Sequence, residues 1–200
     1  SLGLDLEKPV VLFAPTYKPT CLYDLKEAIF KSTKDYNLII KLHHYAWMGK
    51  YASHRQHKIF EDQIEQYPHA IIIPKEDDNI LPLLFVANTL VSEASGAITE
   101  FLATGKTGVI YNLNQESLKH SDGEALLGFD NREYLKESFV HVDTPDELHA
   151  GIKFALNPSD EMKKAQERDK KKIFSKLDGH ASIRVKQIVE QLISDNIKVQ

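Results

Sequence analysis

The sequence has a single cysteine, Cys21, and it lacks any apolar run of about eighteen residues, any block of basic residues and any internal repeat. One cysteine excludes an internal disulfide and fits a reducing compartment. Without a long apolar run or a signal-peptide pattern at its start, the sequence predicts neither a membrane-spanning segment nor secretion. The formal net charge of -4, with no basic block, argues against nucleic-acid binding as the main activity.

One nucleotide-binding motif is incomplete. Residues 104–107, TGKT, resemble the end of a Walker A loop, but the position that must hold the first glycine of such a loop is Glu100. The Gly-Lys pair also follows a predicted helix, whereas in a P-loop it opens one. We therefore interpret Gly105 as a left-handed helix cap and Lys106 as a cation at the negative end of the same helix.

Metal and hydrolase motifs are missing as well. His54 and His57 lie on one predicted helix, yet neither a cysteine nor a carboxylate at metalloprotease spacing accompanies them, so we predict no metal site. No G-x-S-x-G elbow exists in the sequence, and serine-hydrolase chemistry is therefore not predicted.

What the sequence does contain is a regular alternation of strands and helices. Its 200 residues, 42% of them hydrophobic, suit one α/β domain over residues 1–200. Short apolar runs predict strands at residues 10–14, 38–42, 70–73, 89–91, 108–111 and 139–142. Segments of helical period predict helices at residues 22–34, 50–66, 80–86, 97–104 and 145–156. Right-handed crossovers between such units make a Rossmann-like, doubly wound parallel sheet, which binds ligands beyond the carboxyl ends of its strands.

Candidate functional residues follow these strands. Because the carboxyl ends of parallel strands meet at one edge of a sheet, we expect the residues to converge there. They are Pro15-Thr16-Tyr17 after the first strand, His43-His44 after the second, Pro74-Lys75 after the third, residues 92–96 after the fourth and Asn112 after the fifth.

The turn at Ser95-Gly96 predicts a phosphate-binding site. Such a turn leaves N–H groups unpaired at the start of a helix and aims the positive end of the helix dipole at the ligand edge. Plain capping by Ser95, with small residues that let the helix approach the sheet, explains the turn equally well. Glu100 lies five residues after Ser95, and a carboxylate there can accept hydrogen bonds from both hydroxyls of a ribose. The turn and the carboxylate together indicate a nucleotide-binding site.

His43 ends the apolar run of the second strand. An imidazole in that place can donate to a phosphate oxygen or move a proton near neutral pH. A histidine bonded to a neighbouring carbonyl is the structural alternative. Strand alternation directs His44 to the opposite face, so we expect at most one of the pair to reach a ligand, and we favour His43.

The carboxyl-terminal part of the chain predicts two more helices. Residues 159–176 are dense in charge, which is typical of a solvated helix with ion pairs; a basic face for acidic lipid is the less favoured alternative. The helix near residues 181–194 has one broad apolar face, which must pack on something.

Four segments of the sequence occur in an order that is typical of one family. They are VVLFAPTYKP at residues 10–19, IIKLHH at residues 39–44, LVSEASGAITEFLATGKTGVIY at residues 90–111 and LDGHASIRV at residues 177–185. They resemble the A-P-T-W/Y-R, K-x-H-P, T-D-Y-S-S-x-x-x-D-x-x-x-x-G-K-P and D-G-x-A-S-x-R segments of the CDP-glycerol glycerophosphotransferases, the teichoic-acid primases and polymerases. The last segment discriminates best, because generic Rossmann domains have no reason to carry it.

The resemblance implies one half of a GT-B glycosyltransferase-like architecture, the carboxyl-terminal half that holds the donor nucleotide. The implied reaction moves glycerol phosphate, or a related polyol phosphate, from a CDP-linked donor to a hydroxyl of a cell-envelope polymer and releases CMP, without a cofactor. Site residues are carried over by position. The implied roles are catalysis for His43, pyrophosphate binding for Ser95, Gly96 and Lys41, ribose binding for Glu100, and cleft lining for Thr16, Tyr17, Lys18 and Glu93.

The resemblance covers only part of such an enzyme. The family's proposed base and acceptor groove lie in an amino-terminal half that this chain lacks, so we expect a donor-binding fragment with little or no turnover alone. Its closing helix, about residues 181–195, would pack on the missing half. The implied partners are a nucleotide-activated polyol or sugar, that half and a polymer acceptor, with no nucleic acid. The implied location is the cytoplasm, with peripheral attachment to the inner face of the cell membrane through the full-length protein as a further option.

Departures from the family pattern leave open which nucleotide base the donor carries and which group is transferred. Glu93 and Glu100 stand where the family has Asp, and Gly96 stands where it has a second Ser. This version of the turn approaches the S-G-G-x-x-E turn of UDP-N-acetylglucosamine 2-epimerases, which share the fold. A UDP-sugar enzyme of GT-B fold is therefore the alternative, and a non-catalytic nucleotide-binding module is a second one.

Overall fold

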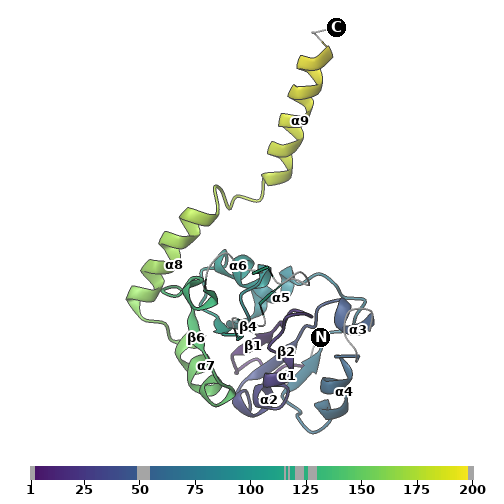
Figure 1. Ribbon diagram of the computed structural model, residues 1–200, viewed down its shortest axis with the longest axis vertical. Helices are drawn as coiled ribbons and strands as arrows, with labels where there is room; N and C mark the ends of the chain where they lie inside the picture. The colour runs from purple at the N-terminus through teal and green to yellow at the C-terminus, as the bar shows by residue number, and fades with distance from the viewer. Residues whose placement is uncertain are drawn as a thin grey trace.

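The computed structural model describes residues 3–48, 55–114, 116, 118–119, 124–125 and 130–197. Six parallel strands form one sheet in the spatial order β3-β2-β1-β4-β5-β6 (Figure 1). All six predicted strands are confirmed, and those of β1, β2, β4 and β5 are buried throughout, whereas β3 and β6 at the two edges are partly buried. The strands are β1 (Val10–Phe13), β2 (Asn37–Ile40), β3 (Ala70–Ile72), β4 (Thr89–Ser92), β5 (Val109–Tyr111) and β6 (Val140–Val142).

The helices follow the predicted alternation, with three differences. The expected helix at residues 22–34 is broken into two short helices. Within the described part of the expected helix at residues 50–66, residues 58–64 are helical, and residues 50–54 lie outside the described part of the chain. The short helix α3 was not predicted. The helices are α1 (Leu22–Leu25), α2 (Ala28–Ser32), α3 (Tyr45–Met48), α4 (Lys58–Ile64), α5 (Leu81–Val86), α6 (Gly96–Leu102), α7 (Leu148–Leu156), α8 (Asp160–Ile173) and α9 (Ala181–Ile197), with the 3-10 turns η2 (Asn131–Glu133) and η3 (Pro145–Glu147).

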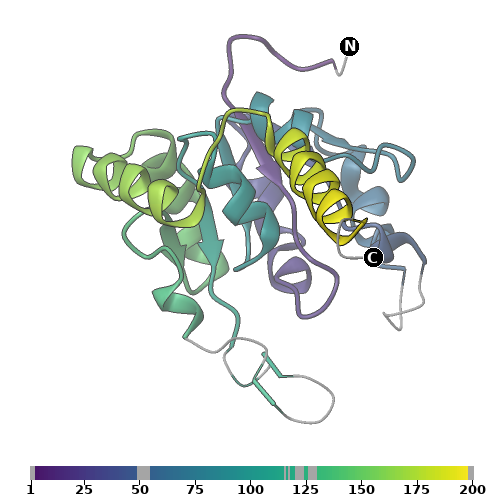
Figure 2. The same cartoon turned by 90° about the horizontal axis from the view of Figure 1, so that it is seen from above.

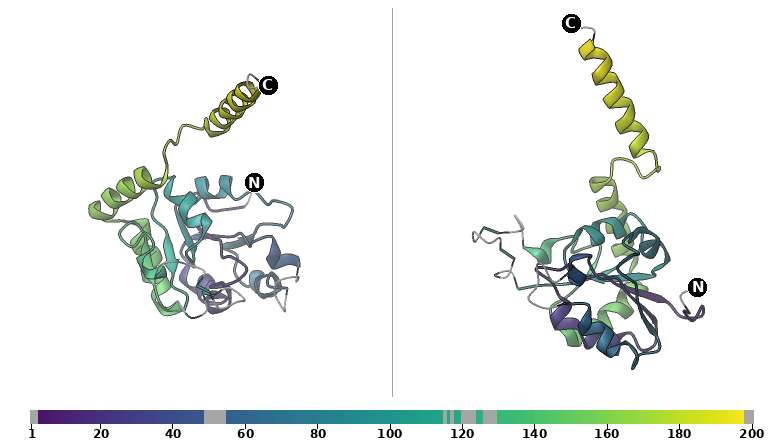
Figure 3. Two further views of the ribbon diagram at one scale, coloured as in Figure 1. Left: turned by 45° about the horizontal axis from the view of Figure 1, so that its top comes forward. Right: turned by 90° about the vertical axis from the view of Figure 1, so that its right-hand side faces the viewer.

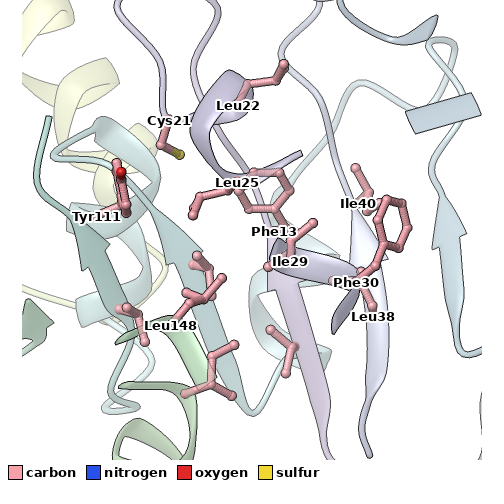
Figure 4. Close-up of a cluster of buried hydrophobic side chains, with 14 of the residues drawn as sticks. Phe13, Cys21, Leu22, Leu25, Ile29, Phe30, Leu38, Ile40, Tyr111 and Leu148 are labelled. Atoms are coloured by element: carbon pink, nitrogen blue, oxygen red, sulfur yellow. The ribbon is translucent and has the colours of Figure 1, made fainter. Parts of the chain in front are cut away.

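Strand alternation divides the core into two layers. On β1, Val11 and Phe13 pack with side chains of α1, α2, α4 and α7, whereas Val10 and Leu12 pack with α5 and α6. Figure 4 shows the first layer, in which Phe13 lies among Leu25, Ile29 and other residues of α1, α2 and β2. Because both faces of the sheet are covered, a ligand can reach it only at an edge.

The sequence around Gly105 ends helix α6 as predicted, but its lysine acts elsewhere. Gly105 has φ +71°, the left-handed conformation expected of a helix-terminating glycine. Lys106 Nζ donates to the carbonyl oxygens of Phe85 (2.5 Å) and Ala87 (2.7 Å) at the end of α5, so the prediction that it serves the end of α6 is wrong. A lysine engaged in this way also excludes the Walker A interpretation of residues 104–107.

The last two helices differ in how they meet the rest of the fold. Gln166 of α8 is buried and donates to Thr107 Oγ1 (2.5 Å) and to the Ser138 carbonyl (3.0 Å). Helix α9 instead projects away from the sheet and its covering helices (Figures 1 and 3), and the connection through residues 174–180 separates it from α8 (Figure 2). None of its residues up to 195 is buried, and its apolar side chains are 47% (Val189) to 61% (Ile188) exposed. Within the described ranges, no helix has the length and apolar character needed to cross a membrane.

The segment that best distinguishes the family forms the start of α9. Asp178 accepts two hydrogen bonds from Arg184 Nη1, both 2.9 Å, and one from the His180 N–H at 3.0 Å. These bonds lower the pKa of the exposed Asp178 carboxyl, first through the His180 N–H and then through Arg184. Gly179 between them has φ +73°, which favours glycine. The motif therefore organises the beginning of a helix rather than a pocket in this chain.

We expect deletion of residues 177–200, which removes α9, to leave the free energy of unfolding within about 0.5 kcal/mol of its original value, because none of residues 177–195 is buried. Urea unfolding followed by circular dichroism measures this change. Deletion of residues 159–200 is the matched control; it also removes α8 with the buried Gln166 and should destabilise the domain clearly. A loss above about 1 kcal/mol on the shorter deletion would mean that α9 does support the domain.

Candidate functional site

The reversal of strand order lies between β1 and β4, and the loops after these strands open onto a cavity of about 420 Å³. We call it the β1–β4 cavity. It gathers eight of the residues that the sequence analysis selected, from the segments that follow β1, β2 and β4. They are Pro15, Thr16, Lys41, His43, His44, Ser95, Gly96 and Glu100. Their convergence follows from the parallel sheet, which brings the ends of β1, β2 and β4 to one edge.

Ser95 and Gly96 form the turn that opens α6. Ser95 has extended backbone angles at the N-cap position, yet its side chain makes no capping hydrogen bond; its Oγ lies 3.1 Å from Ser92 Oγ. A Cβ added to Gly96 would meet no atom of the described residues within 4 Å. Neither a capping bond from Ser95 nor close packing at Gly96 therefore accounts for the small residues of this turn. What remains is a turn of small residues that faces a cavity.

Glu100 lies one and a half turns further along α6, and its exposed side chain lines the same cavity. Ala97, between the turn and Glu100, contributes to this wall as well. A carboxylate in this position can accept hydrogen bonds from two vicinal hydroxyls. As the sequence predicted, Glu100 and the Ser95-Gly96 turn lie on the same cavity.

Lys41 supplies a positive charge to the cavity. Its residue is only 6% exposed, and its backbone N–H is fixed by a 2.9 Å bond to the Phe13 carbonyl. Burial lowers the pKa of the Lys41 ammonium below its ordinary value, while the nearby Asp78 and Asp77 act in the opposite direction. An ammonium in a partly dehydrated cavity gains more from a bound anion than an ammonium on the surface does.

The surroundings of His43 favour its neutral imidazole over the imidazolium. Its Nδ1 accepts a hydrogen bond from the Tyr45 N–H (3.1 Å), which leaves Nε2 to carry the proton in the neutral form. Burial lowers the pKa of His43, and the neighbouring His44 and Lys41 lower it further. Its ring also packs against Tyr17, with 4.7 Å between ring centroids. His43 is therefore a hydrogen-bond donor with a fixed tautomer.

His44 lines the β1–β4 cavity together with His43, so the expectation that strand alternation directs His44 to the opposite face is wrong, while the expectation that at most one of the two reaches a ligand stays a prediction. Strand alternation does not apply to this pair, because β2 ends at Ile40 and His44 lies in the turn before α3. Sequence reasoning placed the strand end too late.

A second cavity, of about 250 Å³, lies beside the first and shares Thr16 and His43 with it. We call it the Glu93 cavity. It is lined by the other predicted cleft residues, Tyr17, Lys18 and Glu93, and by Ala94 and residues that follow β5. The four predicted cleft-lining residues thus lie together, but three of them face a different cavity from the one that Glu100 lines.

Glu93 is the most unusual group of the two cavities. It is 3% exposed, and its two carboxyl oxygens accept hydrogen bonds from the Thr16 N–H (2.5 Å) and the Cys21 thiol (2.7 Å). Burial raises the pKa of Glu93, although the bonds from Cys21 and Thr16 oppose the rise. The pKa of the buried Cys21 thiol at the start of α1 (Figure 4) is raised by burial and then by Glu93. Glu93 thereby fixes the loop after β1, which forms part of both cavities.

Other strand-end candidates lie elsewhere. Asn112 is buried in a structural network, where its Nδ2 donates to Asp143 (3.1 Å) and its Oδ1 lies 2.8 Å from His141 Nδ1. Pro74 and Lys75 are exposed and line neither cavity.

Of the dismissed metal pair, His54 lies outside the described residues. His57 is buried and stacks on Trp47, with 4.6 Å between ring centroids. Among the residues that the structure describes, no three His, Cys, Asp or Glu side chains are grouped as metal ligands would be.

Several lining residues escaped the sequence analysis. Asp78 and Ile80 reach the β1–β4 cavity from the loop after β3, and Leu113 and Asn131 reach the Glu93 cavity from the region after β5. The place of each loop after a strand indicated that the loop would lie near the site. It did not show which residues of the loop line a cavity.

Comparison with known proteins supports the fold and the family. The chain matches the model of the CDP-glycerol:poly(glycerophosphate) glycerophosphotransferase family over residues 1–191. The wall teichoic acid polymerase TagF superposes with a TM-score of 0.66 at 15% identity, over 98% of this chain and 46% of the polymerase chain. A UDP-GlcNAc 2-epimerase from Neisseria meningitidis, solved with bound UDP-GlcNAc, superposes with a TM-score of 0.52 at 13% identity, over 86% of this chain and 46% of the epimerase.

These neighbours confirm the predicted GT-B-like fold, and at such identities they show the fold alone. The chain spans less than half the length of either of them. No curated protein sequence matches the chain.

Proposed function

This chain belongs to the CDP-glycerol:poly(glycerophosphate) glycerophosphotransferase family, and from that premise we propose that it is the donor-binding domain of a transferase. The proposed reaction moves glycerol phosphate, or a related polyol phosphate, from a CDP-linked donor to a hydroxyl of a cell-envelope polymer and releases CMP. The observation that carries the proposal is the β1–β4 cavity, because it joins an open turn, an ammonium, an imidazole N–H and a carboxylate in one space.

The roles of these groups follow from their chemistry. The ammonium of Lys41, the Nε2–H of His43 and the turn at Ser95-Gly96 would bind the donor pyrophosphate, since phosphate oxygens accept charge-assisted hydrogen bonds. Glu100 would accept hydrogen bonds from the ribose hydroxyls. The cavity thus offers donors at one end and an acceptor at the other, which matches a nucleoside diphosphate.

The proposed step is an in-line transfer at the distal phosphorus of the donor. The acceptor oxygen forms a bond to that phosphorus while the bond to the bridging oxygen breaks, and the electron pair leaves with CMP. Lys41 and the Nε2–H of His43 would stabilise the negative charge that grows on the departing nucleotide. The proton of the acceptor hydroxyl requires a base, which we assign to the remainder of a longer protein. We therefore propose that this chain alone binds the donor with little or no turnover, and that the exposed apolar face of α9 packs on that remainder.

A UDP-sugar enzyme of the same fold is the second candidate. The turn Ser95-Gly96 with Glu100 favours it, because this version of the turn is similar to that of UDP-N-acetylglucosamine 2-epimerases. Both candidates require a nucleoside diphosphate in the β1–β4 cavity, and they differ in its nucleotide base, cytosine or uracil.

Calorimetric titration of the chain with CDP, CMP, UDP and UMP tests the proposal. We expect CDP to bind more tightly than CMP, because the second phosphate adds contacts, and more tightly than UDP. Glu100→Ala should weaken CDP binding about 10-fold or more, since a hydrogen bond to a charged group contributes about 1.5–3 kcal/mol. Glu65→Ala, which removes an exposed carboxylate at the end of α4, is the matched control and should have no effect. If none of the four nucleotides binds, both candidate functions are excluded. Tighter binding of UDP than of CDP would favour the second candidate.

A further inference from the structure

Gln56 is a buried polar residue that lies behind the site and lines neither cavity. It is 2% exposed and comes shortly before α4. Its Nε2 donates to the Tyr17 carbonyl at 2.9 Å and to the Tyr23 hydroxyl at 3.2 Å. Its Oε1 is buried and has no hydrogen-bond partner among the described residues. Because a buried amide oxygen without a donor is unfavourable, the place of this side chain needs an explanation.

The carbonyl that Gln56 holds belongs to the residue that packs on His43. The Tyr17 ring lies 4.7 Å from the His43 ring and 4.9 Å from the Tyr45 ring, measured between centroids. The rings of His43 and Tyr45 are 5.2 Å apart, so the three rings form a closed cluster. The Tyr45 N–H fixes the tautomer of His43, and the Tyr17 ring limits how far the imidazole can tilt.

Two buried residues hold successive residues of the loop that carries Tyr17. Glu93, directly after β4, accepts from the Thr16 N–H at 2.5 Å, and Gln56 donates to the carbonyl of Tyr17 at 2.9 Å. Residues 14–20 belong to no helix or strand. These side-chain bonds, rather than secondary structure, therefore set the position of the Tyr17 ring.

We propose that Gln56 is a positioning residue for the donor site, which acts through the Tyr17 ring to fix the direction of the His43 Nε2–H. This inference rests on the proposed function, because it takes His43 as a donor to the phosphates of the nucleotide. A hydrogen bond weakens steeply as its angle departs from linear, so a donor must be held by its supporting residues. Gln56 supplies such support without touching the nucleotide.

The test replaces Gln56 with methionine, which removes both donated bonds and keeps an unbranched side chain of similar length. We expect the ring resonances of His43 to shift in NMR spectra of the ligand-free variant. CDP binding, measured by calorimetry, should weaken about 3- to 10-fold, because the bond from His43 to phosphate is misdirected rather than removed.

The matched control is Gln63→Met. Gln63 Nε2 donates to the Ile59 carbonyl at 2.6 Å within α4, so this variant loses a bond of the same kind away from Tyr17. It should leave the His43 resonances and CDP affinity unchanged.

A double-mutant cycle separates positioning from a merely structural role. Tyr17→Leu alone should shift the His43 resonances and weaken CDP binding, and adding Gln56→Met to it should weaken binding by less than about 2-fold more. Fully additive losses would overturn the inference, as would unchanged His43 resonances in a folded Gln56→Met variant.

A measurement on the unaltered chain covers the case in which the Gln56 variant does not fold. Nuclear Overhauser contacts between the rings of Tyr17 and His43 are expected in the ligand-free protein. Their absence would overturn this inference and leave the proposed function intact. If instead CDP does not bind the unaltered chain while Gln56→Met shifts the His43 resonances, the proposed function fails and the structural link from Gln56 to His43 stands.

Discussion

Replacing Lys41 with methionine is expected to weaken CDP binding about 10- to 150-fold, because a charge-assisted hydrogen bond to phosphate contributes about 1.5–3 kcal/mol. The Lys41 residue is 6% exposed and lines the β1–β4 cavity, so its ammonium is less well hydrated than one on the surface. Methionine retains a long unbranched side chain and removes only the charge and the donors. Calorimetry at low and at physiological salt measures the loss.

The control for this substitution is Lys34→Met. Lys34 is exposed and precedes β2, so it lies at the opposite end of the strand from Lys41. Both substitutions change the net charge by one unit, which separates a contact at the cavity from the general attraction of an anion to the protein. Equal losses for the two variants would show that Lys41 makes no specific contact with the nucleotide.

The same site predicts a direction for the pH dependence of binding. Because burial lowers the pKa of Lys41, its ammonium is lost at a lower pH than that of an exposed lysine. CDP affinity should therefore decline as the pH rises toward that pKa, and Lys41→Met should remove this decline.

The strands could be predicted from the sequence because the sheet is buried on both faces. Each strand is then an apolar run, and the runs at β1 and β4 are buried throughout. The boundaries of the helices were harder to predict from the sequence. The break between α1 and α2 falls at Lys26-Glu27, residues with no helix-breaking character, so local sequence gives no signal for it.

The site could be predicted only as far as the topology determines it. Parallel strands bring their carboxyl ends together, and this rule correctly grouped Thr16, His43 and Ser95. It could not show that two cavities adjoin, nor that Glu93 meets Cys21, because contacts between residues 72 positions apart depend on the packed loops. The helix-dipole argument likewise gave Lys106 to the wrong helix end, since its partners at Phe85 and Ala87 are neighbours only in space.

The electrostatic state of the site was likewise beyond the sequence. The sequence left open whether the imidazole of His43 donates a hydrogen bond or moves a proton, whereas the Tyr45 N–H and the partial desolvation of the ring favour the neutral form. This result changes the roles of Lys41 and His43 in the proposed reaction. Lys41 carries the positive charge, and His43 contributes an oriented N–H without adding a second buried cation.

Glu93→Ala is expected to destabilise the domain by about 2–4 kcal/mol, because it leaves the Thr16 N–H without its acceptor and creates a cavity in a buried place. Glu93→Gln should cost less, since its amide oxygen can still accept from Thr16. Glu100→Ala, at an exposed position of α6, is the matched control and should change the free energy of unfolding by less than about 0.5 kcal/mol. Urea unfolding of the three variants measures these values.

The pH dependence of this stability has a definite sign. The pKa of Glu93 is raised in the folded state, chiefly by burial, so its protonated form stabilises the fold. That contribution is fully present below the pKa of an unfolded glutamate, about 4.3, and is lost as the pH rises through the higher folded-state pKa. Relative to Glu93→Gln, the unaltered chain should therefore lose stability as the pH rises through this window. If the difference between the two proteins is instead independent of pH, the pKa of Glu93 is the same in the folded and the unfolded chain, and burial does not raise it.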